Sequence, residues 1–269
     1  EFFRMWRCPV CISLHSLVPF GVNSVEKSSP LLRRHLNPFN RKMMENFYRF
    51  LRRHGLKATD RLLICDPSSA LLKQVFELMG HSPVDIVEYS DHFDQPDATP
   101  PVPAYDAVLV MEYLECTETP DLVFGRIVSR LRPGGLLVVH TPDAKSITLS
   151  HRFATRLHQP HRIHVLSRLI LESLACGEGL TTQLILKKNY MDTFWPFINF
   201  AAFHELSSFG DGTLDAAIEF RVSHLRRAWW RWPHLLFWGF FGGILRDRSN
   251  LLAVFRKPGP PRQVHIGRV

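Results

Sequence analysis

The chain has 269 residues and a formal net charge of +8, with 33 Lys and Arg against 25 Asp and Glu. Its hydrophobic share of 45% and charged share of 22% are typical of globular proteins and exclude wholesale disorder. No apolar run reaches the roughly 18–20 residues that a membrane-spanning helix needs, which excludes a transmembrane segment. The length fits one large domain, or one domain that carries a sizeable insertion.

The five Cys residues are an odd number scattered along the chain. This usage argues against a disulfide framework and for a reducing compartment. The chain begins at Glu1 instead of Met, so we expect an upstream segment to be missing, and any targeting peptide with it. The basic charge suits the mitochondrial matrix, with the cytoplasm as the alternative. It also suits an anionic partner such as RNA, a ribonucleoprotein or a membrane surface.

Residues 1–39 are predicted to form an irregular N-terminal arm, because prolines interrupt it repeatedly. Within the arm, Cys8-Pro-Val-Cys11 has the ligand spacing of half a zinc site. A structural zinc site needs four ligands, and His15 and His35 are the nearest further candidates. We therefore interpret the two thiols as a reduced pair and expect no bound metal.

A basic amphipathic helix is predicted over residues 40–54, ended by Gly55. Arg52 and Arg53 on its polar face are candidate contacts for RNA phosphate or a protein partner, and a solvated face is the alternative. The apolar side holds Phe47, Phe50 and Leu51, and the basic side holds Arg49, Arg52 and Arg53.

Short apolar runs then alternate with helical segments, which predicts a doubly wound, mostly parallel α/β sheet. In such a sheet the ligand crevice lies at the carboxyl ends of the strands. Strands are expected over residues 61–65, 84–88, 105–110 and 136–140, and helices over 70–79 and 120–131.

The pattern loosens after residue 142. A helix is predicted to begin after Ser167 as its N-cap and to end near Gly177 or Gly179. Further strands are expected over residues 182–186 and 250–255, with an aromatic-rich helical insertion at 189–248 before the last strand. These limits predict a domain over residues 40–258 and a tail over 259–269.

Three segments carry a resemblance to a known family: 105–115, Pro120-Asp121, and 131–143 with its Leu-Arg-Pro-Gly-Gly turn. Together they resemble class I S-adenosylmethionine-dependent methyltransferases. The closest subgroup is the short-spaced one that includes small-molecule O-methyltransferases of the ubiquinone-pathway type. Residues 161–167 are similar to the segment before the next helix in that subgroup. The resemblance covers roughly residues 58–188 and 249–258, and it implies a Rossmann-like fold and S-adenosylmethionine as cofactor.

The resemblance also implies a cofactor site, made of Glu88 and Glu112 together with the loop after the first strand. That loop departs from the family, because Asp66, Ser68 and Ala70 stand at its glycine positions. In a second register Asp66 is the family acid, and Ser68 and Ala70 still replace glycines. Each replacement adds a Cβ where backbone approaches the cofactor, and Pro67 removes an N–H donor.

Two functions stay open on this evidence. The first is a methyltransferase-fold protein without catalysis or bound cofactor, acting as a binding or assembly module in a mitochondrial ribosome or other ribonucleoprotein. The second is an active S-adenosylmethionine-dependent methyltransferase for a small lipophilic molecule, RNA or protein. No residue is identified as catalytic.

The segment 226–232 interleaves cations with aromatic rings, which suits single-stranded RNA or a protein partner. A membrane-interface segment and a partly buried helix with Arg stems over apolar surface are the alternatives. The candidate contact residues are Arg226, Arg227, Trp229, Trp230 and Arg231.

Overall fold

The structure is a computed structural model. It describes residues 5–17, 36, 38–65, 70–87, 104–146, 162–192, 233 and 250–259. The tail from residue 260 onward and nearly all of the expected insertion at 189–248 lie outside these ranges.

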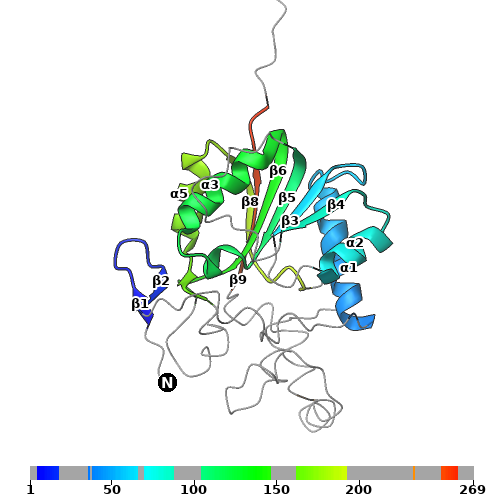
Figure 1. Cartoon of the computed structure of the whole chain (residues 1–269). Helices are drawn as coiled ribbons and strands as arrows, with labels where there is room; N and C mark the ends of the chain where they lie inside the picture. The colour runs from blue at the N-terminus through cyan, green and yellow to red at the C-terminus, as the bar shows by residue number, and fades with distance from the viewer. Residues whose placement is uncertain are drawn as a thin grey trace, which may run out of the picture.

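A six-stranded sheet forms the centre of the described chain, as Figure 1 shows. Its strand order is β4-β3-β5-β6-β9-β8, with parallel pairing from β4 through β6 and β9 antiparallel to both of its neighbours. This is the mostly parallel α/β sheet that the sequence predicts. The strands are β3 (Leu62–Cys65), β4 (Val84–Val87), β5 (Tyr105–Met111), β6 (Leu131–Pro142), β8 (Thr181–Lys187) and β9 (Asn250–Arg256).

Helices cover both faces of the sheet (Figure 1). Successive strand residues point to opposite faces: Leu62 and Ile64 pack with α1 and α2, whereas Leu63 and Cys65 pack with α3 and α5. Both faces of the central strands are therefore buried, which explains the continuous apolar runs within β3, β5, β6 and β9. The helices are α1 (Pro38–Arg53), α2 (Ala70–Leu78), α3 (Pro120–Arg130) and α5 (Arg168–Gly177), and a short 3₁₀ helix η4 spans Leu114–Cys116.

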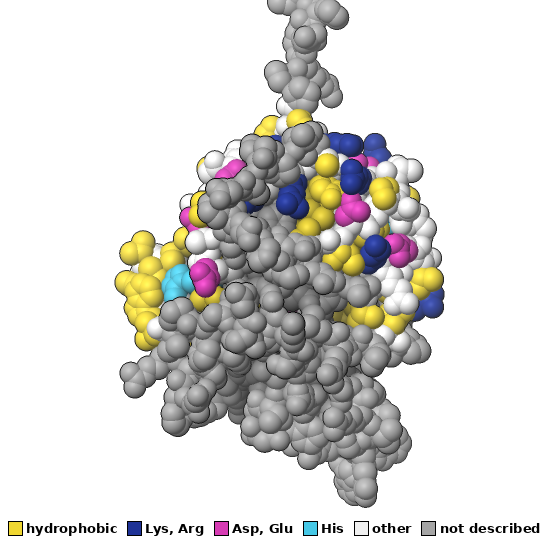
Figure 2. All heavy atoms as spheres, in the orientation of Figure 1, with side chains coloured by type: hydrophobic (Ala, Val, Ile, Leu, Met, Phe, Trp, Pro, Cys, Tyr) yellow, Lys and Arg dark blue, Asp and Glu magenta, His cyan; other side chains and the backbone are white. Residues whose placement is uncertain are grey.

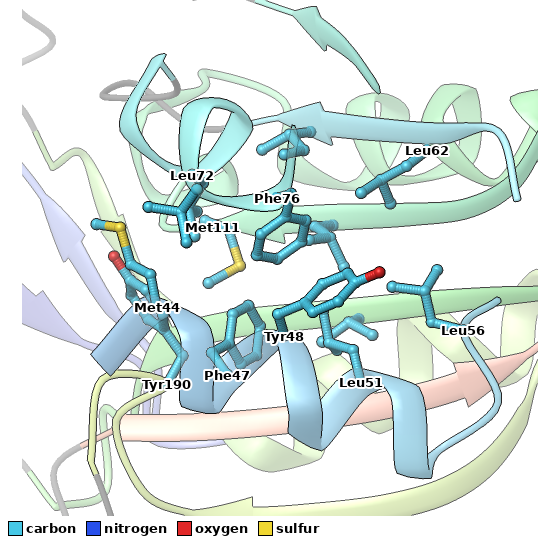
Figure 3. Packing of buried hydrophobic residues seen from close by; sticks show 14 of the residues in the cluster. Met44, Phe47, Tyr48, Leu51, Leu56, Leu62, Leu72, Phe76, Met111 and Tyr190 are labelled. Atoms are coloured by element: carbon cyan, nitrogen blue, oxygen red, sulfur yellow. The ribbon is translucent and has the colours of Figure 1, made fainter. Parts of the chain in front are cut away.

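The predicted amphipathic helix is confirmed as α1. Phe47 is buried, and its ring centroid lies 6.3 Å from that of Phe76 on α2 and 5.2 Å from that of Tyr190 (Figure 3). Arg52 and Arg53 are exposed on the opposite side of the helix. Packing of the apolar face, more than helix propensity, stabilises a helix of this kind.

The Leu-Arg-Pro-Gly-Gly segment differs from a simple turn. Pairing of β6 with β5 already begins at Leu131, and its register shifts before the regular ladder starts at Leu136. Gly134 has φ +79°, a left-handed conformation that glycine adopts without steric cost. Gly135 is needed for a different reason, because a Cβ there would lie 2.7 Å from Cγ of Leu131.

Part of the N-terminal arm is ordered, which corrects the expectation of an irregular segment throughout. Strands β1 (Met5–Arg7) and β2 (Leu14–Ser16) form an antiparallel hairpin, and β2 pairs with β7 (His164–Val165). The period-2 signal of such short strands is too brief to detect from sequence. Among the described residues, no helix combines the length and apolar character needed to cross a bilayer.

Candidate functional site

The carboxyl ends of three parallel strands lie at one level of the sheet. Cys65, the last residue of β3, pairs with Val87 of β4 and with Val110 of β5. Ligands of doubly wound sheets bind beside this edge. Of the predicted cofactor residues, Asp66, Ser68 and Glu88 lie outside the described residues, and Ala70 begins α2 with its side chain not described. That Asp66, Ser68, Ala70 and Glu88 lie together at one cofactor site therefore remains a prediction.

Glu112, the fifth predicted residue, follows β5 directly at this edge. Its backbone has φ +54°, and its N–H donates to the carbonyl of His140 on β6 at 2.9 Å. A left-handed conformation at a non-glycine residue costs on the order of 1–3 kcal/mol and is concentrated at functional sites. The side chain of Glu112 is 28% exposed.

A buried arginine holds the Glu112 carboxylate. The Arg162 guanidinium forms an ion pair with Oε2 of Glu112, and the Arg162 side chain is only 6% exposed. Burial lowers the pKa of Arg162, but the charges of Glu112 and Glu115 outweigh it and raise the pKa above its usual value. Arg162 therefore remains charged. An unpaired guanidinium would be unfavourable in the interior, and the negative charge of Glu112 compensates it.

Two further polar side chains lie behind this ion pair. Glu115 in η4 and His140 on β6 are both fully buried. Neither carboxylate oxygen of Glu115 and neither ring nitrogen of His140 has a hydrogen-bond partner in the described part of the chain. His140 Nδ1 is 3.5 Å from Oε1 of Glu112, close enough for electrostatic attraction but not aligned as a hydrogen bond.

Burial sets the protonation of both groups. It raises the pKa of Glu115 to about 7, although the charge of Arg162 opposes the shift. It lowers the pKa of His140 to about 4, although the charge of Glu112 opposes the shift. At neutral pH the imidazole is therefore uncharged, and the buried carboxyl group is near its midpoint. Perturbed groups that converge at a strand edge are typical of functional sites. We refer to Glu112, Glu115, His140 and Arg162 as the polar cluster.

The backbone fixes the polar cluster from three segments. The carbonyl of Glu115 accepts from the N–H of Ile163 at 2.8 Å, which places Arg162 beside η4. The His140 ring packs edge-on against Tyr190, with the ring centroids 4.8 Å apart. Residues from β5 and η4, from β6 and from the segment before β7 are thus brought together by tertiary structure.

The predicted basic contacts lie elsewhere. Gly55 follows the end of α1, and its backbone lies close to the Arg256 side chain. A Cβ added at Gly55 would be only 2.8 Å from the Arg256 guanidinium. Arg256 pairs with Leu136, where the regular ladder of β6 starts, four residues before His140. Arg52 and Arg53 therefore lie toward the amino-terminal side of the sheet, away from the polar cluster. The other predicted contacts, Arg226, Arg227, Trp229, Trp230 and Arg231, are outside the described residues.

Comparison with known proteins identifies the class. The sequence pattern of the methyltransferase domain family matches residues 44–185, which is just over half of the 269 residues. The chain therefore belongs to the methyltransferase domain family. Comparison with curated protein sequences finds no match.

Solved structures of methyltransferases are similar to this chain at low sequence identity. Phosphoethanolamine N-methyltransferase 2 of Haemonchus contortus, in complex with S-adenosyl-L-methionine, is 14% identical, with a TM-score of 0.50 over 90% of this chain and 61% of that chain. An S-adenosylmethionine-dependent methyltransferase of Mesorhizobium loti is 13% identical, with a TM-score of 0.49 over 78% of this chain and 97% of that chain. A putative methyltransferase of Haloferax volcanii, in complex with the activator Trm112, is 13% identical, with a TM-score of 0.47 over 90% and 99% of the two chains.

Glu112 has the chemistry that S-adenosylmethionine would need from a hydrogen-bond acceptor. The cofactor carries an ammonium group and two ribose hydroxyls, all donors, and the partly exposed Glu112 carboxylate is an acceptor at the strand edge. Sequence reasoning found Glu112 through the resemblance. It gave no role to Glu115, His140 or Arg162. Of these, His140 is a polar residue at the end of an apolar run, whereas Arg162 lies in a polar stretch with no signal of its own.

Proposed function

We propose that this protein is a methyltransferase that transfers the methyl group of S-adenosylmethionine to an N–H or O–H group of a small molecule. The observation that carries the proposal is the strained Glu112, held by buried Arg162 next to two buried side chains whose polar atoms lack hydrogen bonds within the described residues. An unsatisfied buried polar group costs about 1–3 kcal/mol. A chain used only as a docking scaffold would be more stable with apolar residues at these positions.

The chemistry requires an acceptor whose proton is removed. S-adenosylmethionine supplies an electrophilic methyl group, and its sulfonium becomes a thioether when that group is transferred. Glu112 would accept from the ammonium or ribose hydroxyls of the cofactor, since its carboxylate is the partly exposed member of the polar cluster. The buried Arg162 guanidinium pairs with this carboxylate. The acceptor's proton passes to solvent, because burial lowers the pKa of His140 to about 4 and its imidazole does not hold a proton at neutral pH.

Calorimetry with S-adenosylmethionine and S-adenosylhomocysteine tests cofactor binding directly. Wild-type protein should bind both with micromolar dissociation constants, and Glu112→Gln should weaken binding at least tenfold. Glu172→Gln is the matched control, because Glu172 is an acid on α5 that pairs at the surface with Arg168. Absence of binding by the wild-type protein would contradict the proposal.

A second candidate is a binding or assembly module without catalysis, in a mitochondrial ribosome or another ribonucleoprotein. The observation in its favour is the sequence at Asp66, Ser68 and Ala70, where each residue adds a Cβ at a family glycine position. The exposed Arg52 and Arg53 are charges that such a partner could neutralise. A matrix location is part of this proposal and has its basis in the net positive charge.

Binding of single-stranded RNA at several salt concentrations separates the two candidates. The module should bind RNA with an affinity that falls steeply as salt rises, because neutralised phosphates release counterions. Arg52→Ala with Arg53→Ala should reduce that affinity and the salt dependence. RNA binding together with absent cofactor binding would favour the module, and cofactor binding without RNA binding would favour the enzyme.

A further inference from the structure

A buried carboxylate lies directly after β6, at the carboxyl edge of the sheet. Asp143 is 1% exposed, and its Oδ2 accepts from the Ser146 hydroxyl at 2.8 Å. Its Oδ1 accepts from the N–H of Lys145 at 3.1 Å. Two donors from its own loop therefore fix the Asp143 carboxylate, and a buried carboxylate also needs a compensating positive charge.

Lys187, the last residue of β8, supplies that charge. Its Nζ is 3.2 Å from Oδ2 of Asp143 and donates to the Ser146 hydroxyl oxygen at 3.3 Å. Strand β9 lies between β6 and β8, and its Leu251 pairs with Thr141 on one side and with Lys187 on the other. Lys187 therefore lies at the level where β6 ends, and the register of the sheet sets the position of its ammonium group.

This ion pair presents only its positive member to solvent. The Lys187 side chain is 44% exposed, whereas that of Asp143 is 1% exposed. In the surface pair Arg61–Asp85 the acid is 41% exposed as well, and Figure 2 shows Lys and Arg together with Asp and Glu on the same described surface. A lysine ammonium has three donor hydrogens. Since Asp143 and Ser146 engage two of them, one is left for a ligand on the exposed side.

The two segments that form the ion pair carry more cations than acids. Residues 143–146 and 187–192 hold three lysines and two aspartates. One aspartate is the buried Asp143, and the other, Asp192, accepts from a backbone N–H of its own turn at 2.9 Å. Lys145 is exposed. The surface at the ends of β6 and β8 therefore attracts an anion more strongly than a cation.

The cation lies on the side of the edge away from the predicted cofactor residues. Those residues follow β3, β4 and β5, whereas β8 is at the other end of the sheet (Figure 1). Neighbouring strands are about 4.8 Å apart, so three strand spacings put β8 about 14 Å from β5. An acceptor that binds between Glu112 and Lys187 is therefore an extended small molecule, with its N–H or O–H at one end and an anionic group at the other.

We propose that Lys187 binds a carboxylate or phosphate group of the methyl acceptor. The inference rests on the proposed methyl transfer and narrows its acceptor to an anionic small molecule. Asp143 and Ser146 hold the ammonium group in place, and its remaining donor meets an oxygen of the anion in a charge-assisted hydrogen bond.

Chemical modification of the wild-type full-length protein tests the proposal without a variant. Reductive methylation followed by peptide mass spectrometry measures how fast each lysine reacts. Benzoate or inorganic phosphate should slow the modification of Lys187, and the neutral benzamide should not. Lys73 is the internal control, because it pairs with Glu77 at the surface of α2 and should react equally in all three solutions. Protection by benzoate alone supports a carboxylate acceptor, and protection by phosphate alone supports a phosphorylated one.

Calorimetry of the protecting anion gives a second measurement. Lys187→Gln should weaken its binding about fivefold or more, because a charge-assisted contact is lost. Lys187→Arg keeps the charge and should retain most of the affinity, and Lys73→Gln should leave it unchanged.

The proposal is overturned if neither anion protects Lys187 in the wild-type protein. It is equally overturned if Lys187→Gln folds and binds the anion as tightly as wild type. Both measurements are made without S-adenosylmethionine, so a negative result here leaves cofactor binding and the proposed methyl transfer untouched. Failure of the proposed function is detected separately, as absent cofactor binding in the calorimetry with S-adenosylmethionine.

Discussion

Replacing Arg162 by Met should destabilise the fold strongly, because it leaves the Glu112 carboxylate without its buried partner. Breaking a buried ion pair by removing one member costs about 3–5 kcal/mol. Glu112 keeps 28% of its side chain exposed, so water can solvate the orphaned charge in part, and we expect a loss near 3 kcal/mol. This is a large fraction of the about 5–15 kcal/mol that stabilises a typical domain.

A double-mutant cycle at pH 7 isolates the pair. Urea denaturation followed by far-UV circular dichroism gives the free energy of unfolding for wild type, Arg162→Met, Glu112→Gln and the double variant. The double variant should be less destabilised than the sum of the single changes by about 2–3 kcal/mol, since it removes both charges together. Arg168→Met is the matched control, because Arg168 pairs with Glu172 at the surface and should cost at most about 1 kcal/mol. The reasoning would be refuted if the free-energy losses of the two single variants simply added up in the double variant. It would also be refuted if Arg162→Met lost less than about 1 kcal/mol of unfolding free energy, which is the loss expected for the control.

Three further predictions concern packing, capping and pH. Phe47→Ala should cost about 3–5 kcal/mol in urea denaturation, because a fully buried ring is removed; a loss under 1 kcal/mol would show that α1 is not part of the core. Ser167→Ala should lower the free energy of unfolding by about 1–2 kcal/mol, since the Ser167 hydroxyl accepts from the N–H of Ile170 as an N-cap. Ser167→Thr keeps a hydroxyl and should preserve most of this stability. Equal losses in the two variants would contradict the capping role. Burial lowers the pKa of both His15 and His164, whose Nδ1 atoms are 2.9 Å apart. Their contribution to stability is present above the unfolded pKa of about 6.5 and is lost as pH falls below it. Unfolding free energies between pH 5 and 8 should depend less on pH in His164→Gln, and an unchanged dependence would exclude the pair as a source.

The sequence determined the architecture because its signals are local. Continuous apolar runs at β3, β5 and β6, separated by amphipathic helices, are what a sheet buried on both faces requires. Ser167 and Gly134 were recognisable for the same reason: an N-cap and a left-handed turn are decided within a few residues. The β1–β2 hairpin carried too short a pattern to be distinguished from an irregular arm.

Tertiary structure alone decided the polar cluster and the conformation of the Cys pair. Glu112 and Arg162 are 50 residues apart, and their contact depends on how β5, η4 and the segment before β7 are assembled. The protonation of Glu115 and His140 likewise follows from burial, which the identity of a residue does not specify. The spacing of Cys8 and Cys11 does not reveal their conformation, and only the folded structure shows that they lie between β1 and β2 of a hairpin. Local sequence sets backbone preference, whereas desolvation and long-range pairing exist only once distant segments have packed together.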